Sequence, residues 1–195
     1  MKKRLLSALL CAAMLLLSLP AAFAASDLDG HWAKKYIDYL ADEDIINPSA
    51  TTGKYSPDAK VTRAEFMRYI NRAFHFEETA SITYTDVPKS AWYYETVCIA
   101  QKYGYINGVG NNKMDPTGTV TREQAATIIG RLYKADPGSV SASSLDFKDK
   151  AKISSWSAGY IKAAVDKGFL AGYSDGTFQP TREVTRGEVA KIIYY

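Results

Sequence analysis

The feature that most constrains this chain is a unit of sequence that occurs three times. A tryptophan and an arginine mark each unit, and they are separated by 31, 30 and 30 residues. The pairs are Trp32 with Arg63, Trp92 with Arg122, and Trp156 with Arg186. A proline lies six residues before each arginine, and a large apolar residue lies two before that proline. A whole unit of about 50 residues buries too little apolar surface to be stable alone, so we expect the copies to share one core.

Each copy has the same expected anatomy. An aspartate opens it (Asp27, Asp86 and Asp149), and a first helix follows the tryptophan, with apolar residues spaced to share one helix face. A loop rich in Gly, Asp and Pro comes next, and a second helix begins at the arginine. The expected fold class is therefore all-α, with helix-loop-helix repeats at 25–76, 84–133 and 146–195.

The first 24 residues are expected to be a secretory signal peptide. They combine a basic start, an apolar run over 5–19 and a small-residue exit at Ala22-Phe23-Ala24. An uncleaved anchor is the weaker interpretation, because the run is shorter than the roughly 20 residues of a membrane span. A lipoprotein at Cys11 is also weaker, because Leu10 is bulky for that signal. We expect a soluble, exported protein.

Charge and cysteine content exclude several function classes. The leader carries three of the 24 basic residues, which leaves 21 Lys and Arg against 21 Asp and Glu. This balance argues against a general nucleic-acid binder or a polybasic membrane module. Cys98 is the one cysteine after the leader, so no intramolecular disulfide is expected. A buried apolar role for Cys98 is favoured over a nucleophilic one.

The start of each second helix carries the pattern T-R-x-E/Q, which predicts a capping box. The threonine side chain would accept a bond from the backbone three residues on, and the Glu or Gln would accept one from the threonine amide. The predicted N-caps are Thr62, Thr121 and Thr185, and their partners are Glu65, Gln124 and Glu188.

The capping box does not explain the arginine. A cation beside the positive end of a helix dipole costs about 0.3–1 kcal/mol when it is exposed. One interpretation is an anion receptor, in which the guanidinium and free backbone amides bind a carboxylate together. The alternative is a structural salt bridge to the aspartate that opens each copy. For the tryptophans a core position is expected first, and contact with a sugar ring second.

The three copies resemble S-layer homology domains. The resemblance rests on "DLDGHWA", "TDVPKSAW" and "FKDKAKISSW", on the loops "GYINGVGNNKMDP" and "GFLAGYSDGTFQP", and on "TRAE", "TREQ" and "TRGE". It implies a pseudo-threefold arrangement with grooves between neighbouring repeats. It also implies non-covalent anchoring to the bacterial cell wall, by binding a secondary wall polysaccharide that carries pyruvylated N-acetylmannosamine. The expected location is the cell surface.

The resemblance also assigns candidate glycan-binding residues. Arg63, Arg122 and Arg186 would bind the ketal carboxylate, and Trp32, Trp92 and Trp156 are secondary candidates. Gly108 and Gly172 would let the loop backbone approach the sugar. The first copy departs from the pattern, with Asp44 and Pro48 at the glycine positions, a loop one residue longer, and Ala25 in place of an aromatic residue. Its groove is expected to be weak.

Two other function classes remain to be weighed. A structural or protein-interaction module of the envelope, without glycan binding, is the main alternative. A wall hydrolase is disfavoured, because His31 and His75 are the only histidines and the sequence shows no zinc-ligand cluster or nucleophile motif. No cofactor, metal or nucleic-acid partner is expected. The third repeat ends at Tyr195, which leaves open an anchor alone or part of a longer protein.

Overall fold

The computed structural model describes residues 26–138 and 140–195, and within them the regular secondary structure is helical, joined by long loops. The predicted signal peptide, 1–24, lies outside these residues. The α-helices are α2 (Lys34–Asp42), α3 (Arg63–Ala73), α4 (Tyr94–Tyr103), α5 (Arg122–Leu132), α6 (Ala158–Asp166) and α7 (Arg186–Tyr194). Two 3-10 turns, η1 (Ala142–Ser144) and η2 (Lys150–Lys152), lie between α5 and α6. The described residues contain isolated β-bridges and no sheet, so the expected all-α fold of three repeats is confirmed.

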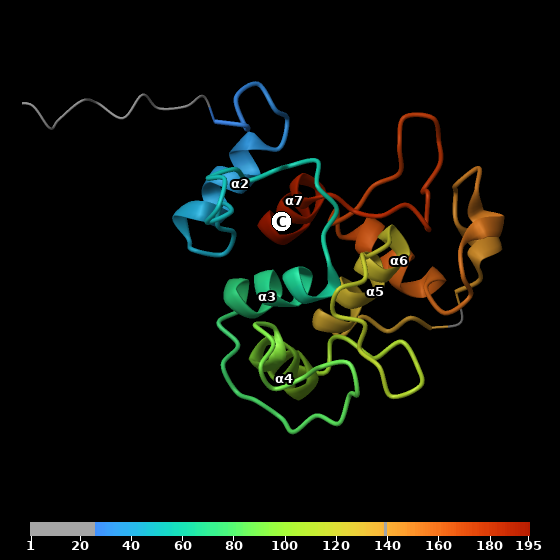
Figure 1. Ribbon diagram of the computed structural model, residues 1–195. Coiled ribbons are helices and arrows are strands. Elements are labelled where there is room, and N and C mark those ends of the chain that lie inside the picture. The colour runs from blue at the N-terminus through green and yellow to red at the C-terminus, as the bar shows by residue number, and fades with distance from the viewer. Residues whose placement is uncertain (1–25, 139) are drawn as a thin grey trace, which may run out of the picture.

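The helices pair between repeats. The first helix of each repeat packs on the second helix of another, so that α4 packs on α3, α6 on α5, and α2 on α7. Figure 1 shows α3, α5 and α7 on the inside, with α2, α4 and α6 around them. Because α2 comes from the first repeat and α7 from the third, the three repeats form a closed ring.

The centre of the ring is built from the residues just before the second helices. Val61, Val120 and Val184 are fully buried there. The amide of Val61 donates to the carbonyl of Val184 (3.2 Å), that of Val120 to Val61 (3.1 Å), and that of Val184 to Val120 (2.9 Å). In this central set each valine donates one hydrogen bond to another repeat and accepts one from the third, which fixes the pseudo-threefold arrangement.

The first amides of the second helices also bind a neighbouring repeat. Arg63 and Ala64 donate to the carbonyls of Gly118 and Pro116, at 2.8 and 2.9 Å. The corresponding amides of α5 and α7 donate in the same way to 180–182 and 57–59. The third amide of each helix donates to the threonine N-cap, and all three capping boxes are present. The expectation of free amides at these helix starts is therefore wrong, because neighbouring carbonyls occupy them.

The aspartate that opens each repeat holds the loop before the proline. The carboxylate of Asp86 accepts hydrogen bonds from the amides of Met114 (2.9 Å) and Asp115 (2.8 Å). Asp27 and Asp149 make the same pair of bonds in their own repeats. The second amide donor in each pair has a positive φ, 52° at Asp115, a conformation that costs about 1–2 kcal/mol for a residue with a side chain. The carboxylate offsets that cost.

The proposed salt bridge from these aspartates to the motif arginines is wrong. Among the described residues no ion pair joins one of these aspartates to a motif arginine, because the aspartate carboxylates accept hydrogen bonds from loop amides.

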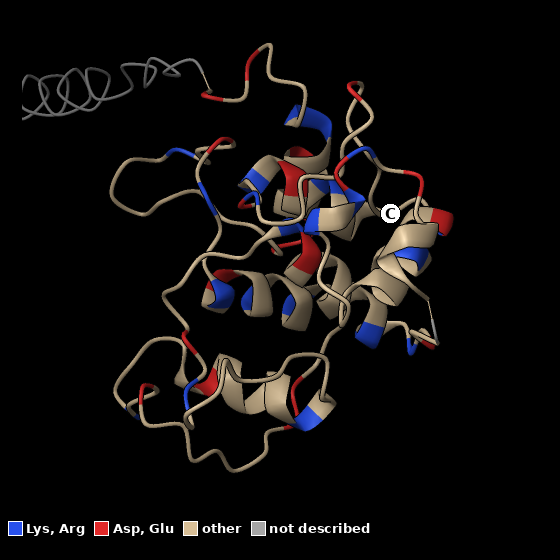
Figure 2. Ribbon diagram, turned by 90° about the vertical axis from the view of Figure 1, so that its right-hand side faces the viewer, with Lys and Arg blue, Asp and Glu red and all other residues tan. Residues whose placement is uncertain are grey.

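In the view of Figure 2, basic and acidic segments are mixed over the ribbon. This agrees with the balanced composition of the sequence.

Acid should destabilise the fold through Asp86. Burial alone would raise the pKa of Asp86, but the amides of Met114 and Asp115 outweigh it, and the pKa lies below its ordinary value. Such a carboxyl contributes stability above its unfolded pKa, and that stability is lost as the pH falls through the folded pKa. We expect the thermal unfolding midpoint to fall as the pH is lowered from about 5 to 3. Asp86→Asn should flatten this dependence, and an equal slope in that variant would contradict the assignment.

Candidate functional site

In the described part of the chain, three of the cavities lie between repeats, and we name each after the repeat that supplies its loop and second helix. Groove 1 is formed by α3 and Glu43, Asp44 and Asn47, with Trp92 from the second repeat, and has a volume of about 600 Å³. Groove 2 is formed by α5 and 106–109, with Trp156 from the third repeat, and measures about 450 Å³. Groove 3 is formed by α7 and 168–173, with Trp32 from the first repeat, and measures about 270 Å³.

Grooves 2 and 3 each contain a motif arginine from the preceding repeat. Arg63 lines groove 2 and is 5% exposed, and Arg122 lines groove 3 and is 4% exposed. The Nε and Nη2 atoms of Arg63 donate to the carbonyls of Met114 and Asn107, both at 2.8 Å. Arg122 makes the equivalent bonds to Phe178 (2.8 Å) and Ala171 (2.7 Å). These carbonyls compensate a cation placed at the start of a helix.

The third guanidinium nitrogen of each arginine, Nη1, makes no hydrogen bond to the described residues. Among the described residues no hydrogen bond uses Nη1 of Arg63 or Nη1 of Arg122, although the latter lies 4.0 Å from a carboxylate oxygen of Glu188. Burial lowers the pKa of both arginines, but an arginine stays charged at neutral pH. Each cavity therefore contains a fixed, buried positive charge that still has donors to offer.

Arg186 is placed differently from the other two. Its Nη2 donates to a carboxylate oxygen of Glu65 at 2.5 Å, its Nη1 donates to the carbonyl of Tyr55 at 3.0 Å, and its Nε is buried without a partner. It does not line the cavity of groove 1. The structure thus brings Arg63 and Arg122 to cavities, while the charge of Arg186 is balanced inside the protein.

The expectation that the tryptophans lie in the core is wrong. Trp32, Trp92 and Trp156 are 52%, 56% and 51% exposed. Each precedes the first regular turn of its helix, so the buried stripe starts after it, as at Tyr36 and Ile37 in α2. Each ring instead borders one cavity, and contact with a sugar ring, the second expectation for the tryptophans, stays a prediction.

The two loop glycines are required by the packing of the loop itself. A Cβ atom at Gly108 would lie 2.5 Å from the carbonyl oxygen of Lys113 and 2.9 Å from the Tyr84 ring. At Gly172 it would lie 2.7 Å from the Phe147 ring. The first repeat has Pro48 at the glycine position and also lacks the aromatic residue in its sequence. Both glycines border a cavity, but the close approach of a backbone carbonyl and an aromatic ring explains why no side chain is tolerated.

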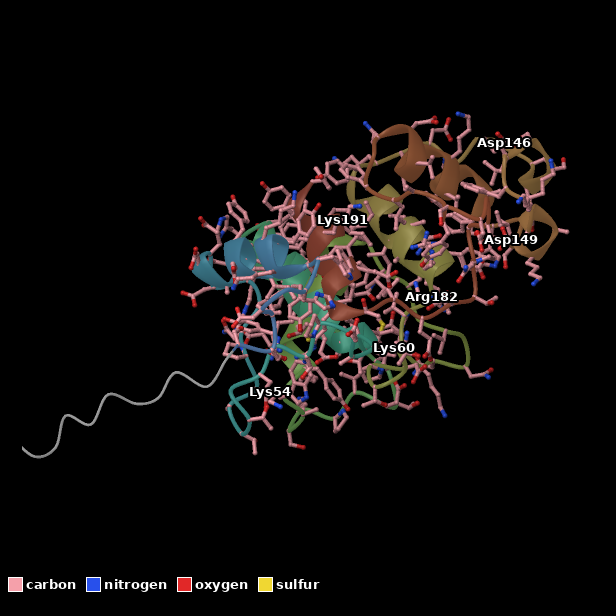
Figure 3. The ribbon with its side chains drawn as sticks, turned by 90° about the horizontal axis from the view of Figure 1, so that it is seen from above. Lys54, Lys60, Asp146, Asp149, Arg182 and Lys191 are labelled. Atoms are coloured by element: carbon pink, nitrogen blue, oxygen red, sulfur yellow. The ribbon has the colours of Figure 1, made fainter. Side chains whose placement is uncertain are left out.

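Sequence reasoning missed the basic residues on the second helices. Arg68 and Arg72 line groove 1, Arg131 lines groove 2, and Lys191 lines groove 3. Arg68 lies over the ring of Trp92, with its Cζ atom 4.8 Å from the ring centroid. Figure 3 labels Lys191 on α7 and Arg182 on the segment before it. A signal in the sequence could have found two of them. Arg68 and Lys191 each lie three positions after the capping-box glutamate of their helix, a spacing that places both residues on one helix face.

The sequence comparisons agree with this architecture. A family model for the S-layer homology domain matches residues 26–67, 83–126 and 146–190. This chain belongs to the S-layer homology (SLH) domain family. Within the described residues no helix is long and apolar enough to cross a membrane. In the same residues no cluster of His, Cys, Asp and Glu is arranged to hold a metal ion.

Relatives of this SLH chain are much longer proteins. An amylopullulanase of Thermoanaerobacterium thermosulfurigenes is 33% identical over 87% of this chain, which spans 9% of that protein. A surface-layer 125 kDa protein of Lysinibacillus sphaericus is 26% identical over 83% of this chain and 14% of its own length. A cellulosome-anchoring protein of Acetivibrio thermocellus is 37% identical over 46% of this chain and 20% of its own length.

Gly108→Ala should destabilise the SLH fold. The added methyl group would displace the Lys113 carbonyl or the Tyr84 ring, and such overpacking costs typically 1–3 kcal/mol. Urea denaturation followed by circular dichroism measures the change in the free energy of unfolding. Val109→Ala, at an exposed neighbour, is the matched control and should change it by no more than about 0.5 kcal/mol. Equal stability of the two variants would remove the packing explanation for Gly108.

Proposed function

We propose that this protein attaches non-covalently to the bacterial cell wall by binding an acidic wall polysaccharide in grooves 2 and 3. The ligand unit that we propose is pyruvylated N-acetylmannosamine, as the family resemblance implies. One observation carries the proposal: each of these grooves combines a buried arginine with an unbonded nitrogen and an exposed tryptophan from another repeat.

The chemistry of the two grooves suits a sugar that carries a carboxylate. A carboxylate can accept hydrogen bonds from the Nη1 atom of Arg63 or Arg122, in a cavity where screening by water is reduced. The indole face of Trp156 or Trp32 can pack on the apolar C–H face of a pyranose ring while its edge stays in water. Both guanidinium groups are already oriented by loop carbonyls, which lowers the entropic cost of binding.

The relatives support an anchoring role rather than a catalytic one. The name of one of them states that it anchors a cellulosome, and another is a surface-layer protein. In the amylopullulanase the matching region spans only 9% of the length, as expected for a region apart from the catalytic part. We therefore propose a non-enzymatic module, exported by its signal peptide and held at the cell surface.

Groove 1 should contribute least to binding an acidic polysaccharide. The charge of Arg186 is balanced by Glu65, and four carboxylates border the cavity: Glu43, Asp44, Glu77 and Glu95. These four carboxylates outnumber the two arginines of the same cavity, Arg68 and Arg72, so a negatively charged sugar would meet net repulsion there. This supports the expectation that the first copy is weak, for a reason that differs from its missing glycines.

Co-sedimentation with purified cell walls tests the proposal. Trp156→Ala and Trp32→Ala should each weaken binding roughly tenfold, as expected for removing an aromatic contact at the centre of a binding site. Trp92→Ala, in groove 1, is the matched control with a smaller effect. Because all three side chains are more than half exposed, circular dichroism should show unchanged folding.

Two results would contradict wall-polysaccharide binding. One is equal sedimentation with walls from which the secondary polymer has been removed. The other is binding that a pyruvylated saccharide fails to inhibit. Either result would favour the alternative, a protein-interaction module of the envelope that does not bind glycan.

A further inference from the structure

The last residue of the T-R-x-E/Q motif differs in charge between the three repeats. It is Glu65 in the first repeat, Gln124 in the second and Glu188 in the third. All three complete a capping box, so the helix start accepts either residue type. Glu and Gln therefore serve equally as the capping residue. They differ in the second atom of the head group, the one that does not accept the threonine amide.

In the first and third repeats that second atom is a carboxylate oxygen directed at arginine. Oε2 of Glu65 accepts the amide of Thr62 at 2.9 Å, and Oε1 accepts Nη2 of Arg186 at 2.5 Å. In Glu188, Oε2 accepts the amide of Thr185 at 2.9 Å. Its Oε1 lies 2.5 Å from Nη1 of Arg182 and 4.0 Å from Nη1 of Arg122.

In the second repeat the corresponding atom is a neutral donor. Oε1 of Gln124 accepts the amide of Thr121 at 3.1 Å, so the side-chain NH₂ group is left at the other end. Gln124 lines groove 2 together with Arg63 and Arg131, and none of the described residues that line that cavity carries a carboxylate. Among the described residues no ion pair reaches Arg63, although its side chain is almost completely buried.

We propose that the capping-box residue sets the anion selectivity of grooves 2 and 3, whose cavities it lines, and that Gln124 makes groove 2 the tightest site for a negatively charged sugar. The proposal rests on the function proposed above for the ligand class. The order of affinity for an acidic sugar is groove 2, then groove 3, where Glu188 is shared with Arg182, and then groove 1. A neutral sugar does not experience this difference, because it adds no charge to the cavity.

The test exchanges the charge and retains the helix cap. Trp32→Ala with Trp92→Ala leaves groove 2 as the complete site, and Gln124→Glu is then added to that protein. The probes are the methyl glycoside of N-acetylmannosamine with and without the pyruvate ketal, titrated by calorimetry. A carboxylate a few ångströms from the bound ketal should weaken binding of the acidic probe about tenfold at partial screening. Binding of the neutral glycoside should stay within about twofold.

The reciprocal exchange in groove 3 should increase the affinity for the acidic probe, where Gln124→Glu decreases it in groove 2. Trp92→Ala with Trp156→Ala leaves groove 3 as the complete site, and Glu188→Gln removes the charge near Arg122. The acidic probe should then bind more tightly, and its affinity should depend more steeply on salt. Thermal unfolding of all variants checks the fold, which should persist because Glu and Gln occupy the same capping role in this chain.

The outcomes separate this inference from the proposed function. If the unsubstituted protein binds neither probe nor cell walls, the glycan-binding function fails and the inference fails with it. If the unsubstituted protein binds the acidic probe but Gln124→Glu leaves its affinity unchanged, only the inference is overturned. The same holds if groove 2 alone does not bind the acidic probe while the full protein does.

Discussion

The structure depends on a ring of backbone hydrogen bonds between repeats at the starts of the second helices. The amides that an α-helix leaves unpaired at its N-terminus must find acceptors. Here the first two amides of each second helix donate to carbonyls of a neighbouring repeat, as Arg63 and Ala64 do to Gly118 and Pro116. A local requirement of the helix thereby becomes the contact that holds the three repeats in register.

The same contact places the motif arginines. Because Arg63 and Arg122 follow the caps directly, their side chains extend toward the loop of a neighbouring repeat, and the loop carbonyls accept two of their donors. What is left of each guanidinium faces a cavity bordered by a tryptophan. Under the proposed function, structural and binding roles meet in one side chain, and replacing it would affect both the junction between repeats and the cavity.

Much of this fold could be predicted from the sequence, because it follows from local patterns that occur three times. The helix positions, the caps at Thr62, Thr121 and Thr185, and the all-α class needed only spacing and residue type. Which helix packs on which could not be predicted in the same way. Nothing in the sequence of α2 indicates that its partner is α7 of the third repeat rather than its own second helix.

The site was predicted less completely, and the reasons are physical. The motif pointed to Arg63, Arg122 and Arg186, and the structure brings only the first two to the cavities described. The receptor of free amides was wrong because acceptors from another repeat cannot be seen in a local pattern. The tryptophans resembled core residues by type, and only their position ahead of the first helical turn places them outside. The effect of Glu65 on Arg186 depends on two residues 121 positions apart, a pair that spacing within one repeat does not show.

The pairing of α2 with α7 distinguishes this molecule from an open solenoid. In a linear array each repeat touches only its neighbours, so terminal units can fray while the middle stays folded. A closed ring has no terminal unit, and loss of any one repeat exposes the flanks of both others. Unfolding should therefore proceed as one cooperative event, in which all three grooves are lost together.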